Sequence, residues 1–182
     1  MAISEEENII VVTCGRFEKG ITQYIMQRIT DTFNVQVNLK ACDMDVTKFY
    51  DPTRRQYNAN LLIESLRSRA PVGYLKYMGL FRGDLFIPIL TYIFGQATLN
   101  GQYALASMYR LRNELYGLAP DNELMLQRFG KVTIHELGHT FGLIHCNNPV
   151  CIMRSSTYVE DLDMKYMEFC HDCQDVLQSK RQ

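Results

Sequence analysis

The sequence predicts an α+β fold built on a mixed, twisted β-sheet. In the first 70 residues, strand-like and helix-like segments alternate in the order strand, helix, strand, helix. Three further strand-like runs and then one long helix follow, so the alternation expected of a purely parallel sheet is broken. Apolar residues make up 47% and charged residues 21% of the 182 residues, which is typical of one globular domain rather than of a disordered chain.

The first half of the chain contains two predicted strands and two predicted helices. The β-branched run at 8–14 predicts a buried strand. Val35, Val37 and Leu39 alternate with polar residues, which predicts a second strand. In both helical segments, apolar side chains recur on one face at helical spacing. The expected elements are strands at 8–14 and 34–41, helices at 18–32 and 54–69, and a polar loop at 43–53.

The second half is predicted to add three strands and a long helix. The strands are expected near 72–78, 86–95 and 103–110, and the helix from Asp121 to about residue 143. Pro88 has no N–H for a sheet hydrogen bond, so the middle run is interpreted as an edge strand or a bulged one. Asp121 is a suitable N-cap residue, and Gly130 is expected to interrupt the helix. Residues 146–173 have little periodicity, and a short helix is expected after them.

Charge and the N-terminal residues exclude several classes of protein. The net charge is −1 and no basic stripe is present, so neither nucleic acid nor an anionic membrane is the expected partner. The N-terminus is acidic, and its apolar run at 9–12 is far too short for a signal peptide or a membrane span. We therefore expect a cytoplasmic protein whose cysteines stay reduced.

The residues able to bind metal are concentrated in one part of the chain. All four histidines and four of the six cysteines lie between residues 135 and 173. Residues 135–145 read HELGHTFGLIH. On a helix, His135 and His139 lie one turn apart on the same face, a spacing that allows both imidazoles to bind one Zn²⁺.

A third histidine and a glutamate complete this motif. Gly142 tolerates the left-handed conformation that ends a helix, which would bring His145 back to the same ion. Three imidazoles leave a position for water, as in catalytic zinc sites. Glu136 follows the first ligand and is predicted to act as general base toward the metal-activated water. A chance HExxH match is the competing interpretation, and the added Gly142 and His145 argue against it.

The cysteines form a second pattern. Cys146 and Cys151 make one pair, and Cys170 and Cys173 form a C-x-x-C pair further on, a layout typical of a closed, structural zinc site. His171 is a candidate substitute for one thiolate. Two disulfides and four unrelated buried cysteines are the alternatives. For the other two cysteines, Cys14 and Cys42, core packing is predicted.

Together, these motifs resemble a known family. The pattern from His135 to His145 is similar to that of the metzincin clan of zinc peptidases, and Met153 matches the methionine that those proteins carry in a tight turn beneath the metal. The four cysteines narrow the resemblance to the archaemetzincins. Residues before 135 match more loosely, through element order, the stretch 94–97 and Arg110-Leu111.

The resemblance has implications for the whole chain. It implies a single metzincin-like domain over 1–182, with the sheet and active-site helix in 1–145 and a zinc-bound, cysteine-rich region in 146–182. It also implies two zinc ions per chain, one catalytic and one structural. Finally, it implies a substrate cleft beside an antiparallel edge strand, for which 91–97 is the candidate, with the peptide added to that strand.

The predicted function is zinc-dependent peptide-bond hydrolysis acting on a peptide or protein. The motif does not separate an endopeptidase from an aminopeptidase, which needs an acid or a carbonyl group near the cleft to hold the substrate's α-amine, with Glu114 and Asp84 as candidate acids. The alternative is a catalytically silent module that binds zinc or peptide, against which the intact Glu136 argues. A redox-responsive protein that uses the four cysteines is a third hypothesis. The sequence leaves the oligomeric state open and is compatible with a monomer.

Overall fold

A five-stranded mixed sheet forms the centre of the computed structural model, which describes residues 7–42 and 44–180. The order is β2-β1-β5-β8-β7. The first four strands are parallel, and β7 pairs antiparallel with β8 at the edge. The strands are β1 (Ile9–Cys14), β2 (Val37–Cys42), β5 (Lys76–Phe81), β7 (Gly95–Ala97) and β8 (Tyr103–Ser107). The predicted mixed sheet with an antiparallel edge strand is therefore confirmed.

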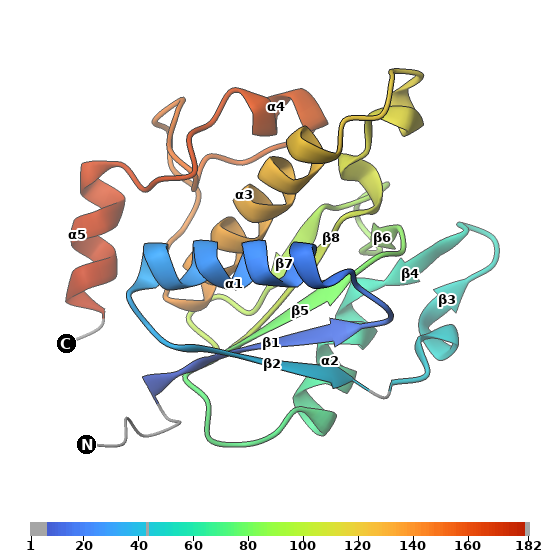
Figure 1. The fold of residues 1–182 in the computed structure, drawn as a ribbon, viewed down its shortest axis with the longest axis horizontal. Helices are drawn as coiled ribbons and strands as arrows, with labels where there is room; N and C mark the ends of the chain where they lie inside the picture. Colours follow the sequence, from blue (N-terminus) through green and yellow to red (C-terminus); the bar gives the residue numbers. More distant parts are fainter. Residues whose placement is uncertain (1–6, 43, 181–182) are drawn as a thin grey trace.

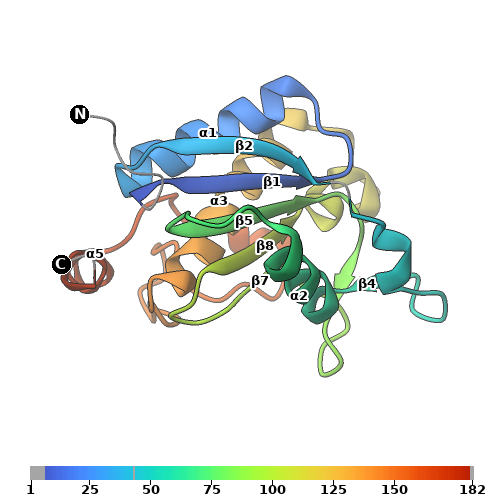
Figure 2. The same ribbon diagram turned by 90° about the horizontal axis from the view of Figure 1, so that it is seen from below.

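Helices cover both faces of this sheet (Figures 1 and 2). Helices α1 (Lys19–Phe33) and α3 (Asn122–Thr140) pack on one face, and α2 (Ala59–Arg69) packs on the other. All six residues of β1 are buried, because both of its faces are covered, and this explains its run of apolar residues without alternation.

Smaller elements surround this core. A second sheet has the order β3-β4-β6, in which β4 is antiparallel to β3 and parallel to β6. Beyond α3, the chain makes long loops that carry two short helices (Figure 1). The elements are β3 (Tyr50–Asp51), β4 (Gln56–Asn58), β6 (Leu85–Phe86), α4 (Val159–Asp163), α5 (His171–Ser179) and 3-10 helices at 46–49, 109–111 and 113–116.

The predicted helix at 54–69 begins too early. Asp51 accepts hydrogen bonds from the N–H groups of Thr53 and Arg54, which forms a turn, and Arg55 has a positive φ of 55°. Helix α2 starts only after Asn58, whose side chain caps it. The predicted loop at 43–53 was also partly wrong, since it holds a 3-10 helix and β3, while residue 43 lies outside the described residues.

The predicted strand at 86–95 is wrong as a single element. Residues 87–94 form a turn and a loop between β6 and β7, bridged by Leu85 and Ile93. Pro88 lies in that turn and not in an edge strand. An edge strand is indeed present nearby, at β7, but Pro88 is not the reason for it. The other two strands are offset: the one expected at 72–78 is β5, at 76–81, and the one expected at 103–110 ends at Ser107.

Helix α3 carries the histidine motif and is anchored at several points. Asp121 caps it by accepting a hydrogen bond from the N–H of Leu124 at 2.9 Å, as predicted. The expected interruption at Gly130 is wrong, because α3 continues to Thr140. The guanidinium of the buried Arg128 makes a bidentate pair with Asp163 at 2.7 and 2.6 Å, which fixes α3 against α4.

The helices of residues 7–42 and 44–180 are all unsuited to spanning a bilayer. None of them combines the length and the apolar character needed to cross it. Residues 1–6, which carry most of the acidic N-terminus, lie outside the described residues.

Candidate functional site

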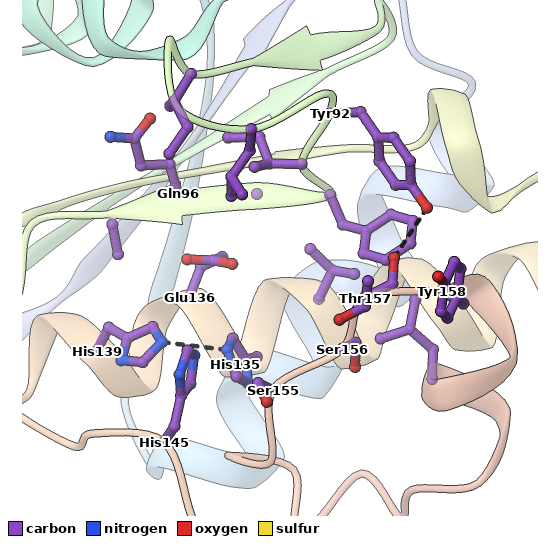
Figure 3. A pocket seen from close by; sticks show the side chains of 18 of the residues that line it. Tyr92, Gln96, His135, Glu136, His139, His145, Ser155, Ser156, Thr157 and Tyr158 are labelled. Carbon is purple, nitrogen blue, oxygen red and sulfur yellow. Dashed lines mark hydrogen bonds between the residues drawn. The ribbon is translucent and has the colours of Figure 1, made fainter.

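Helix α3 and the turn that follows it bring three histidines together (Figure 3). His135 and His139 lie one turn apart on α3. Past the helix end, Gly142 has φ +88°, a left-handed conformation that reverses the chain. His145 then returns toward the helix, with its ring centroid 5.3 Å from that of His135 and 5.0 Å from that of His139.

Backbone carbonyls fix which ring nitrogens face inward. The Nδ1 of His135 lies 2.8 Å from the Ile152 oxygen, and the Nδ1 of His139 lies 2.7 Å from the Leu143 oxygen. Because a carbonyl can only accept, each Nδ1 carries the proton and each Nε2 keeps a lone pair. The two Nε2 atoms face each other at 3.1 Å, an arrangement in which both lone pairs could bind one cation.

These imidazoles suit zinc in charge and in spacing. Two nitrogens of a tetrahedral zinc site lie about 3.3 Å apart when each Zn–N distance is about 2.0–2.1 Å. Burial lowers the pKa of His135 to about 3 and also lowers the pKa values of His139 and His145, so the rings are neutral near pH 7. One ligand nitrogen from each histidine lies within 4.8 Å of the others.

Glu136 lies on the same helix and faces the edge strand β7. A Cβ added at Gly95 would lie 2.6 Å from the Glu136 Cγ and 2.9 Å from its Oε1, so the absence of a side chain at Gly95 makes room for the carboxylate. Burial raises the pKa of Glu136 to about 8, although Lys165 acts in the opposite direction. This pKa is well matched to proton transfer near neutral pH.

The three histidines and Glu136 line a cleft of about 610 Å³. One wall is the segment from Ile87 to Ala97, and the other is formed by 155–158 with Leu162 and Lys165 (Figure 3). The Tyr92 hydroxyl donates a hydrogen bond across the cleft to the Thr157 oxygen at 2.9 Å. The lining is mostly apolar, as is common in sites that bind peptide side chains.

Met153 lies directly beneath the helix. It is fully buried, and a Cβ added at Gly138, between His135 and His139, would lie 2.5 Å from its sulfur. The N–H of Cys146 bonds to the Met153 oxygen at 3.0 Å, which ties the segment carrying His145 to this turn. Met153 therefore supports the site by packing.

Sequence reasoning missed the second wall of the cleft, formed by 155–158, Leu162 and the charged residue Lys165. Lys165 is 3% exposed and lines the cleft, and its Nζ donates to the oxygens of Arg154 at 2.6 Å and Ile152 at 3.3 Å. The surrounding sequence is polar and aperiodic, so no local pattern distinguishes Lys165 from the exposed basic residues.

The four cysteines of the C-terminal region form a second group. Their sulfurs lie within 4.8 Å of one another, with Cys146 and Cys170 3.7 Å apart and Cys151 and Cys173 3.8 Å apart. Two sulfurs at about 2.3 Å from a tetrahedral zinc lie about 3.8 Å apart, so this spacing fits zinc and is too long for disulfides.

Backbone N–H groups stabilise negative charge on two of these sulfurs, whereas burial raises the pKa values of Cys151 and Cys173. Cys151 accepts N–H···S bonds from Met153 and Cys170, both at 3.4 Å. The N–H of Cys173, in the first turn of α5, lowers the pKa of Cys170. His171 does not join the cysteines: its side chain is 87% exposed and its Nδ1 lies 3.1 Å from the Asp175 carboxylate.

The two acids considered for binding a substrate amine lie elsewhere. The Asp84 carboxylate is buried and paired with Arg110 at 2.7 and 2.6 Å. Glu114 is exposed on a 3-10 helix. Neither side chain is part of the cleft lining.

Comparison with known proteins places this arrangement in one family. The model of peptidase family M54 matches residues 7–179. The archaemetzincin of Methanocaldococcus jannaschii is 32% identical over 172 residues, which cover 94% of this chain and 93% of that protein.

Solved structures agree with the sequence comparisons. The crystal structure of archaemetzincin from Methanopyrus kandleri has a TM-score of 0.85 at 33% identity, covering 97% of this chain and 96% of that chain. A zinc-dependent peptidase from Methanocorpusculum labreanum has a TM-score of 0.79 at 28% identity, covering 93% and 99%. The chain therefore belongs to peptidase family M54, the archaemetzincins, and is a zinc metallopeptidase.

Proposed function

We propose that the protein hydrolyses peptide bonds with His135, His139 and His145 as ligands of a catalytic zinc and Glu136 as general base. The observation that carries this proposal is the convergence of three neutral imidazoles beside a buried carboxylate in one cleft. A zinc ion held by three imidazoles lowers the pKa of a bound water to about 7 and polarises a substrate carbonyl.

Glu136 has the position and proton affinity that the reaction requires. It takes a proton from the attacking water and delivers it to the leaving amine. The bare backbone of Gly95 keeps the Glu136 carboxylate between α3 and β7, so that the base stays next to the strand where the substrate lies. The apolar lining removes competing water, which strengthens these interactions.

We propose that the peptide lies along β7. In the described part of the chain, β7 pairs with β8 on one side and has no strand on the other. Its free edge can add an extended peptide by backbone hydrogen bonds, next to Glu136. The large, mostly apolar space between β7 and the loop at 155–158 would take a side chain of that peptide.

A structural zinc held by Cys146, Cys151, Cys170 and Cys173 is the second part of the proposal. Four thiolates form a coordinatively closed site, which stabilises structure and leaves no position for a substrate. Cys146 follows His145 directly, so the same short segment would reach both metals.

Glu136 is the only carboxylate among the described residues of the cleft lining. A second acid that could bind a substrate α-amine is therefore absent from that lining, which supports an endopeptidase over an aminopeptidase. The cytoplasmic location remains a prediction, to be tested by cell fractionation.

A Glu136→Gln variant tests the mechanism. Because Gln keeps the shape but cannot accept the proton, hydrolysis of a peptide library should fall by a factor of about 10²–10⁴ while the zinc content stays the same. Metal analysis should find two zinc ions in the native chain and one after all three histidines are replaced by Ala. Equal cleavage by the native protein and by Glu136→Gln would show that Glu136 is not the general base. Native protein that binds the peptides but cleaves none would favour the silent binding module.

A further inference from the structure

Lys165 is a buried cation within the cleft whose charge the mechanism above does not use. It is 3% exposed, and its two hydrogen bonds go to the backbone oxygens of Ile152 and Arg154. Among the residues that the structure describes, no carboxylate lies within 4.0 Å of its Nζ.

The other buried lysine or arginine among the described residues, Arg128, is neutralised directly by a carboxylate, and so is the partly exposed Arg110. Arg110 and Arg128 each form a bidentate pair with a carboxylate, the shortest N–O distance being 2.6 Å in both. Burying an ammonium group without an anion costs free energy, because two carbonyls replace only part of its hydration. Lys165 is therefore an exception that calls for a functional explanation.

The two carboxylates whose charges act on Lys165 make their contacts with other groups. Glu136 faces β7 and acts as the base. The Asp161 carboxylate accepts hydrogen bonds from the N–H groups of Thr157 and Tyr158. Burial lowers the pKa of Lys165 to about 8, and the more distant Glu136, Asp161 and Cys151 only partly offset this. An additional anion in the cleft would stabilise the protonated form.

We propose that Lys165 binds a carboxylate of the peptide substrate, either the C-terminal α-carboxylate or an acidic side chain. This inference rests on the proposed peptidase function of the same cleft. The ammonium has three donors, of which two are used by carbonyl oxygens, so one remains for a ligand. Its neighbours in the lining, such as Leu162 and Val132, are apolar and would strengthen an ion pair by excluding water.

An alternative role for Lys165 is to hold the turn at 152–154 in place, as a structural clamp. Its two acceptors flank Met153, and the Ile152 oxygen also accepts from His135. A residue that only held this turn would affect all substrates alike. Carboxylate recognition, in contrast, changes the ratio between charged and neutral peptides.

Binding of three matched peptides separates these roles. All are N-acetylated and share one neutral sequence, apart from a single substitution in the third, with the central amide N-methylated to block cleavage. The first has a free C-terminal carboxylate, the second a C-terminal carboxamide, and the third a carboxamide with one internal glutamate. Calorimetry measures the Kd of each for the zinc-loaded native protein and for Lys165→Met and Lys165→Arg. Lys131→Met is the matched control, because Lys131 is a half-buried lysine of the same region that donates to the Leu162 oxygen and does not line the cleft.

The native protein should bind one carboxylate peptide about tenfold more tightly than the neutral one. Whether the first or the third peptide gains identifies the carboxylate source. Lys165→Met should abolish this preference, Lys165→Arg should keep part of it, and Lys131→Met should leave it unchanged. Equal binding of all three peptides to the native protein would overturn the proposal, even if the Met variant does not fold. So would an equal loss for all peptides in Lys165→Met, which would indicate the clamp.

This experiment separates the inference from the proposed function. Binding to the blocked peptides requires no turnover. A native protein that prefers carboxylates but does not cleave the unmethylated peptides would contradict the peptidase mechanism and support the role of Lys165.

Discussion

At the residue scale, two glycines determine the shape of the site. Gly95 lets the Glu136 carboxylate lie against β7, and Gly138 lets the sulfur of Met153 pack against α3. Neither has a positive φ, so the reason for glycine is close approach and not backbone conformation. The motif spacing predicted that the three histidines and Glu136 meet at one site, whereas the contacts made by these glycines depend on the tertiary structure.

Gly95→Ala should reduce activity strongly. The new Cβ would lie 2.6 Å from the Glu136 Cγ and 2.7 Å from the Leu105 oxygen, so the carboxylate or the strand must move. Displacing a catalytic group by about 1 Å costs on the order of 100-fold in rate. Steady-state kinetics checks this, with Gly20→Ala as control, since a Cβ there meets nothing within 4 Å. Unchanged kcat/KM in Gly95→Ala would disprove the steric argument.

Lys165 should titrate well below ordinary lysines. Burial lowers its pKa to about 8, from the usual 10.5. The folded protein then releases this proton before the unfolded chain does, so the group adds stability as pH rises from about 8 to 10.5. Lysine ¹³Cε chemical shifts measure the pKa, and denaturant unfolding of the native protein against Lys165→Met isolates the stability change. A pKa near 10.5 would show that Lys165 is exposed to water.

At the element scale, the accuracy of sequence prediction depended on how local the determining interactions are. The helices α1 and α3 and the strand β1 followed from periodicity, a β-branched run and the cap at Asp121. The segment at 54–58 did not, because the Gln56 side chain bonds to Asp84 and to the Thr91 oxygen, far away in sequence. The region predicted as one strand at 86–95 is divided into β6, a loop and β7. This division and the burial of Lys165 likewise depend on contacts with residues far away in sequence.

Replacing Cys173 by Ser should loosen the C-terminal region selectively. Helix α5 has few buried side chains, Cys173 and Leu177 among them, so its position depends on the proposed thiolate site. We expect amides of 146–180 to exchange hydrogen much faster while β1 and β5 stay protected. Zinc content should fall from two ions to one. Leu177→Ala serves as a control that weakens packing but keeps all four thiols.

At the scale of the whole molecule, the sheet supports one wall of the cleft and the metal-binding segments support the other. The parallel strands and α1 to α3 form most of the core, whereas the chain after Thr140 has mainly loops and two short helices, which add buried residues such as Ile152 and Leu162 to that core. The sequence predicted this division, because the candidate metal ligands all lie at or after residue 135 and the low periodicity begins soon after, at residue 146.

Removing zinc should therefore lower stability in two steps. A bound ligand at about 1,000 times its Kd stabilises the folded state by about 4 kcal/mol. Calorimetric melting of the native protein, of the variant without the three histidines and of the variant without the four cysteines should show separate losses in Tm. If chelation left the native Tm unchanged, neither group would bind metal in solution.

The shortness of β7 has a consequence for which proteins can be attacked. Three residues of strand span about 10 Å, so the backbone register between enzyme and target is brief. If the peptide adds to β7 as proposed, such a short strand would pair with any flexible stretch able to straighten locally, such as a protruding tail or a partly unravelled loop. Tightly folded targets would escape, and choice among the remaining ones would depend on accessibility more than on a long consensus sequence.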